Sequence, residues 1–127
     1  MNTWSVIGLV ALGGALGSVG RYLVGQWFLE RLGPGFPWGT LSINVVGAFL
    51  IGVVLQSAAS RIGLNPYLRL FCATGILGGF TTFSTFAYEI YTLSASTLPW
   101  QGVLYACVSV GFGVLAAFAG VTLVKVL

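Results

Sequence analysis

Residues 78–86 read Gly-Gly-Phe-Thr-Thr-Phe-Ser-Thr-Phe, and this run decides the fold because it interrupts a segment long enough to cross a membrane. Lipid offers the backbone no hydrogen-bond partners, so irregular backbone at bilayer depth persists only where protein buries it or where it lines a polar cavity. The half-helices on either side, Leu68–Leu77 and Ser84–Leu93, would each be about 15 Å long, which is about half of a bilayer. The run therefore predicts a helix broken near the midplane and marks the candidate functional site.

The whole chain has the composition of an integral membrane protein. Of its 127 residues, 57% are hydrophobic and 6% are charged, whereas roughly a quarter of residues are charged in soluble domains. A helix of about 20 apolar residues crosses a bilayer, and the chain has four such segments, at Trp4–Phe28, Trp38–Gln56, Tyr67–Leu93 and Gly102–Val124. We therefore predict an all-α, multi-pass membrane protein, with residues 1–127 forming a single domain of four transmembrane helices.

The few charged residues exclude several classes of function. No basic stripe is present that could neutralise several phosphates, so nucleic acid is not an expected partner. The chain has no His and no Asp, and its two Cys lie far apart in apolar stretches, so neither an enzyme active site nor a zinc site is expected. Four crossings divide the basic residues almost evenly between the two sides of the membrane, so the positive-inside rule fixes no orientation. Insertion in both orientations is therefore expected.

A broken helix places two kinds of backbone group at the midplane. The first half ends in carbonyl oxygens with partial negative charge, which can hold a small hard cation, and the second half begins with N–H groups, which favour an anion. Phe83 and Phe86 are three positions apart and so share a helical face, with Ser84 and Thr85 between them. Because aromatic ring edges are weakly electropositive, rings beside hydroxyls at such a break favour pore lining over the alternative, plain core packing.

Polar side chains on the other segments extend this pattern. Asn44 lies a third of the way into the second segment, with Thr40 four positions earlier on the same face. Tyr105 and Ser109 are likewise four apart on the fourth segment. Amide and hydroxyl groups without charge suit an anion better than a cation or a proton. An interhelical hydrogen bond is the alternative role for Asn44, and Glu89 is equally open to a structural or a functional role.

Together these features resemble the Fluc family of fluoride channels, also called CrcB, over essentially the whole chain. The resemblance is carried by residues 17–22 in the first segment, by residues 39–41 and Asn44 in the second, by residues 78–86 and Glu89 in the third, and by Tyr105 and Ser109 in the fourth. It implies a fluoride-selective channel of the cell (inner) membrane that exports fluoride passively. It also implies an antiparallel, dual-topology homodimer embedded in membrane lipid, with two pores.

The resemblance further implies roles for particular residues. The fluoride path would be lined by Asn44, Phe83, Phe86, Tyr105 and Ser109. To these we add Thr40, which shares a face with Asn44, and the hydroxyls of Ser84 and Thr85, which lie between the two rings in the sequence. The main-chain carbonyls of Gly78 and Thr81 from each subunit would hold a structural Na⁺ at the two-fold axis. Arg21 would be the vestibule arginine, although a basic residue near the end of a span can also simply extend toward the headgroups. Gly113 departs from the family pattern, because some relatives have a further hydroxyl there.

One alternative function belongs to a class of proteins with a similar size and charge balance. A small multidrug-type exporter is also built from four short helices, but it exchanges protons against cations through a carboxylate within the membrane. The first segment contains no such carboxylate. The sequence therefore favours the channel.

Overall fold

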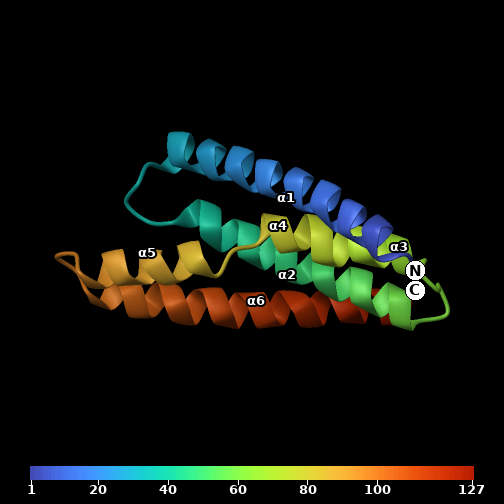
Figure 1. Cartoon of the computed structure of the whole chain (residues 1–127). Helices are drawn as coiled ribbons and strands as arrows, with labels where there is room; N and C mark the ends of the chain where they lie inside the picture. The colour runs from blue at the N-terminus through green and yellow to red at the C-terminus, as the bar shows by residue number, and fades with distance from the viewer.

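The computed structural model describes all 127 residues, and its regular structure is entirely helical. Four spans lie side by side, namely α1 (Thr3–Leu32), α2 (Trp38–Ala59), a third span over Pro66–Ser94, and α6 (Trp100–Val126) (Figure 1). Each is long and apolar enough to cross a membrane. Both termini lie at the same end as the loop after α2, and the other two loops lie at the opposite end (Figure 1). The predicted four crossings are confirmed.

The helices extend beyond the apolar segments that predict them. The first helix reaches Leu32 rather than Phe28. It begins where the Asn2 side chain accepts a hydrogen bond from the Trp4 N–H at 3.0 Å, and it ends at Gly33, whose φ of 73° favours glycine. The added C-terminal turn contains the charged residues Glu30 and Arg31, which suit the headgroup region. A hydropathy pattern leaves such residues out.

The third span changes its helical type along its length. It consists of α3 (Pro66–Arg69), the π-helix η1 (Leu70–Leu77), α4 (Gly78–Phe80) and α5 (Ser84–Ser94). Helical structure stops only at residues 81–83, where Thr81 is extended with φ −78° and ψ 157°. The predicted break is therefore present, but it is shorter than the 78–86 run, because both ends of that run are helical. We call residues 81–83 the break.

The break lets the third span change its neighbour. The first half, η1 and α4, packs on α1, whereas α5 packs on α6 (Figure 1). Glycine allows the first of these contacts, since a Cβ at Gly13 would lie 2.6 Å from the Phe71 carbonyl oxygen, and one at Gly79 would lie 2.5 Å from the Gly14 carbonyl oxygen. Such distances leave no room for a side chain. The small-residue clusters of α1 thus serve close helix packing within the chain.

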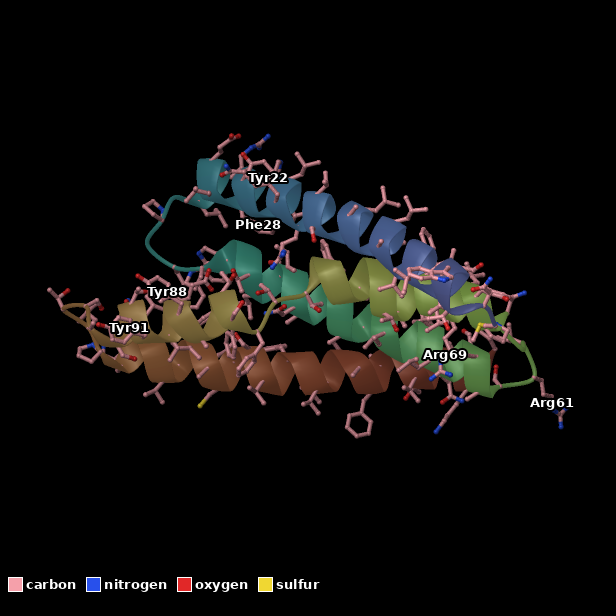
Figure 2. The ribbon with its side chains drawn as sticks, viewed as in Figure 1. Tyr22, Phe28, Arg61, Arg69, Tyr88 and Tyr91 are labelled. Carbon is pink, nitrogen blue, oxygen red and sulfur yellow. The ribbon has the colours of Figure 1, made fainter.

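The buried core of the single chain is small. Tyr105 is fully buried, and it packs with Phe86 and Leu93 between α5 and α6. Many large apolar side chains are exposed instead, as expected for a surface that faces lipid or another protein. Figure 2 shows Arg61 extending from the loop after α2, and it shows Phe28 on the side of α1 that faces α2.

Candidate functional site

Asn44 on α2 holds the break. Its Nδ2 donates to the Thr82 carbonyl oxygen at 3.0 Å, and its Oδ1 accepts from the Thr82 N–H at 2.9 Å. One side-chain amide thus pairs both backbone groups of a residue that lies outside any helix, which a membrane interior requires. The second N–H of the Asn44 amide remains available to another acceptor. Asn44 is therefore hydrogen-bonded to the break of the third span, and its amide keeps one donor for a further role.

Side chains accept the hydrogen bonds of two N–H groups that would otherwise continue the helix across the break. In a continuous α-helix, the Thr82 and Thr85 N–H groups would bond the carbonyls of Gly78 and Thr81. Here the Thr82 N–H bonds Asn44 instead, and the Thr85 N–H bonds Thr82 Oγ1 at 3.3 Å. The Gly78 and Thr81 carbonyls accept no backbone hydrogen bond from the following turn. These two are the oxygens that the family resemblance assigns to a cation.

The Thr81 side chain is fixed by its neighbours. Its hydroxyl donates to the Leu77 carbonyl oxygen at 2.8 Å, so the hydroxyl is used within its own helix. Its methyl group packs against Gly47 of α2, where any Cβ would collide with Thr81 Cγ2. Gly47 therefore allows α2 to approach the break closely. Of the oxygens of Thr81, only the carbonyl is left without a partner.

A pocket of about 300 Å³, which we call the break pocket, opens beside these residues. It is lined by Asn44, Thr81, Thr82, Phe83, Phe86, Ser109 and Val110. The Ser109 hydroxyl is buried and has no hydrogen-bond partner. A buried polar group left unpaired costs about 1–3 kcal/mol, so the Ser109 hydroxyl is a free donor toward whatever enters the pocket. The rings of Phe83 and Phe86 border the same pocket, with centroids 6.0 Å apart and planes at 60°.

Glu89 on α5 joins two of the predicted hydroxyls. Thr40 Oγ1 donates to Glu89 Oε1 at 2.7 Å, and the Tyr105 hydroxyl donates to Oε2 at 2.6 Å. Bonds to a carboxylate are short and strong. In both hydrogen bonds the hydroxyl is the donor, so the Thr40 and Tyr105 protons point to the Glu89 carboxyl group and not toward an anion. Direct donation from Thr40 or Tyr105 to an ion therefore stays a prediction.

Of the remaining predicted residues, Arg21 and Thr85 line a pocket and Ser84 does not. Arg21 and Thr85 line a pocket of about 550 Å³ that α1 shares with α2 and α5, and Thr82 and Thr40 also border it. We call it the wedge pocket. Thr82 also lines the break pocket, and Thr40 also lines a third cavity beneath the α1–α2 loop. Ser84 is exposed at the start of α5 and lines none of the three.

The sequence analysis did not select Thr82 and Gly47 as site residues. Thr82 precedes Thr85 by three positions, which is the spacing of a hydroxyl that caps a helix N-terminus, so a capping search could have found it. No such signal exists for Gly47, because its role depends on which residue of the third span lies opposite. The same holds for the pairing of Glu89 with Thr40, which are 49 positions apart.

Comparison of the sequence with known proteins shows the family to which the chain belongs. The sequence model described as "CrcB-like protein, Camphor Resistance (CrcB)" matches residues 8–121. A protein of Rhizobium meliloti named "Fluoride-specific ion channel FluC" is 50% identical over 117 residues, which cover 92% of this chain and 94% of that protein. Proteins of the same name from Rhizobium etli and Thermus thermophilus are 48% and 49% identical, over 94% and 88% of this chain and 95% and 87% of their own lengths. The chain is therefore a multi-pass membrane protein that belongs to the CrcB family.

Proposed function

We propose that this chain is a fluoride-selective ion channel of the cell (inner) membrane that lets fluoride leave the cytoplasm passively. The observation that carries the proposal is the break pocket. At this one place, the unpartnered Ser109 hydroxyl, the spare N–H of Asn44 and the rings of Phe83 and Phe86 border a single space beside a broken span. The relatives named as fluoride-specific ion channels support fluoride as the ion.

The chemistry of the pocket suits this anion. Fluoride is small and strongly hydrated, so a pore has to replace its water with close donors. A fixed positive charge would hold the ion too tightly for release, whereas hydroxyl, amide and ring-edge groups attract it more weakly. Asn44 and Ser109 supply such groups without charge, and the basic Arg21 borders the wedge pocket instead. A channel, and not a proton-coupled exporter, follows from this donor set.

We propose further that two copies pair antiparallel as a homodimer. Phe83 is 79% exposed although it belongs to the break, and Gly78 at the start of α4 is exposed as well. The wedge pocket is lined by polar groups that lipid cannot satisfy, among them Ser18, Arg21, Gln26, Thr82 and Thr85. An inverted second copy would cover these surfaces, and the balanced basic charge permits both orientations.

A structural Na⁺ is part of this proposal. The freed carbonyls of Gly78 and Thr81, taken from two copies, would supply four neutral oxygens near the axis. Neutral oxygens suit a hard monovalent cation, while a divalent cation would require carboxylates, and no cluster of three or more acidic, His or Cys side chains exists in the chain. When bound, the ion would neutralise the partial negative charge of the helix ends. The Gly78 and Thr81 carbonyls of the two copies, facing one another at the axis, would then keep the two breaks aligned.

Fluoride efflux from liposomes tests the channel. Protein reconstituted with an internal fluoride load should release fluoride without a proton gradient, and it should release chloride far more slowly. Phe83→Ile and Phe86→Ile keep the bulk of the side chain but remove the ring edge, so both should reduce efflux strongly. Phe112→Ile on the exposed face of α6 is the matched control and should leave efflux unchanged. Equal chloride and fluoride release, or full rates in both pocket variants, would refute the proposal.

A further inference from the structure

The loop between α1 and α2 places an aromatic ring against Tyr105. The centroids of the Phe36 and Tyr105 rings lie 5.4 Å apart with their planes at 83°, an edge-to-face contact. Phe86 makes a second contact of this kind with Tyr105, at 5.2 Å and 67°. Tyr105 has no exposed surface. Its ring is therefore held by one aromatic residue from the break pocket and by another from a loop.

The local sequence fixes Phe36 in this position. Gly33 ends α1 with a φ of 73°, and Pro37 precedes the first residue of α2, so the connection is short and bordered by constrained residues. The Trp38 N–H donates to the Phe36 carbonyl oxygen at 2.8 Å, and the two rings lie 4.7 Å apart. Phe36 is consequently anchored by backbone and ring together, and it faces the core despite its place in a loop.

Phe36 also separates Tyr105 from an open space. A cavity of about 310 Å³ lies beneath the loop and is bordered by Phe28, Phe36, Thr40 and Glu89, among others. We call it the loop cavity. Tyr105 is not part of its lining, although the Tyr105 hydroxyl donates to Glu89 at 2.6 Å. Removing the Phe36 ring would open this cavity toward Tyr105 and would give the phenol room to leave the carboxylate.

We propose that Phe36 is a positioning residue for ion conduction, which holds the Tyr105 ring between the loop and Phe86 so that its hydroxyl stays on Glu89. This inference rests on the proposed channel function, because it concerns how fast fluoride passes. It also assigns a task to the α1–α2 loop, whose sequence otherwise reads as a plain connector. Phe36 acts through Tyr105 and touches no ion.

The accessibility of Tyr105 tests the placement without any measurement of flux. Tetranitromethane nitrates exposed tyrosines, and mass spectrometry of peptides assigns the modified residue. We expect Tyr105 to be protected in the native protein and to react several-fold faster in Phe36→Leu. Phe28→Leu alters the same cavity at a residue without an aromatic contact to Tyr105, so it should leave Tyr105 protected. Phe36→Trp keeps an aromatic ring at position 36 and should also leave Tyr105 protected. Equal nitration of Tyr105 in Phe36→Leu and in the native protein would overturn the inference.

Flux then tests the consequence. An edge-to-face aromatic contact is worth enough to change a rate by about 2- to 10-fold, so Phe36→Leu should slow fluoride efflux by that factor while the protein elutes as the native assembly. In a Tyr105→Phe background no hydroxyl remains to be positioned, and Phe36→Leu should cause no further loss. If Phe36→Leu slowed efflux by the same factor in the Tyr105→Phe background as in the native protein, Phe36 would act by another route and the inference would be overturned. A native protein that releases no fluoride would instead refute the proposed function, while the nitration result would still decide the role of Phe36.

Discussion

Replacing Asn44 by alanine is expected to weaken the proposed sodium binding as well as the fold. The substitution removes both hydrogen bonds to Thr82. If the two Thr82 groups stayed unpaired, the cost would be about 2–6 kcal/mol, from about 1–3 kcal/mol for each group. Interhelical hydrogen bonds in membranes average only about 0.6 kcal/mol, because the freed groups find other partners. The partner that helical geometry offers the Thr82 N–H is the Gly78 carbonyl. We therefore expect a loss of about 1–2 kcal/mol in folding stability and the loss of one cation-binding oxygen per copy.

Thermal unfolding in sodium chloride and in N-methylglucamine chloride measures this effect. A bound ion stabilises the folded state according to its concentration relative to its dissociation constant, so a tenfold weaker site lowers the stabilisation by about 1.4 kcal/mol. The native protein should be more stable in sodium, and Asn44→Ala should lose most of that difference. Asn65→Ala is the matched control, since it removes an amide that accepts from the Tyr67 N–H at 2.8 Å, at the start of α3. An undiminished sodium effect in Asn44→Ala would refute the reasoning, and no sodium effect in the native protein would refute the sodium site itself.

Three further outcomes are expected. Ser109→Ala should slow fluoride efflux severalfold without lowering the unfolding temperature, because it removes a buried hydroxyl that has no partner; a clear loss of stability would contradict this. Gly79→Ala should destabilise the protein by about 1–3 kcal/mol because its Cβ meets the α1 backbone, whereas Gly14→Ala, whose Cβ meets nothing within 4 Å, should not; equal unfolding temperatures would exclude the tight contact. A single Cys in the α1–α2 loop, in a background without Cys72 and Cys107, should be labelled from each side of the membrane in about half of the copies; labelling from one side alone would exclude dual topology.

The break could be predicted from the sequence because its cause is local. A Gly and hydroxyl run within an apolar span conflicts with a continuous helix whatever surrounds it, and the four spans follow from segment length. The partners of the break could not be predicted, because they depend on the register between helices. Asn44 forms a hydrogen bond with Thr82, which lies 38 positions later in the sequence. The sequence does not show whether the Asn44 amide bonds the backbone or contacts an ion directly. The π-helix η1 likewise has no evident local signal.

Phe36 shows a different limit of sequence interpretation. It lies among Gly33, Pro34, Gly35 and Pro37, and such a composition indicates a connector. A single aromatic residue in a connector carries no periodicity, so only the fold shows that it faces the core. Glu89 is an intermediate case, since a lone carboxylate in a span signals importance without naming its partners. Its two hydroxyl donors come from two other helices.

The change of neighbour along the third span has a consequence for biosynthesis. The first half of that span packs on α1, which leaves the ribosome before it, whereas α5 packs on α6, which is the last helix to be made. While the chain is being synthesised, the first half can dock at once, but α5 waits in the membrane without its main neighbour. Ser109, which completes the break pocket, is also on α6. A nascent chain released before α6 is inserted would therefore hold its break in place through Asn44 and still have no pathway beside it.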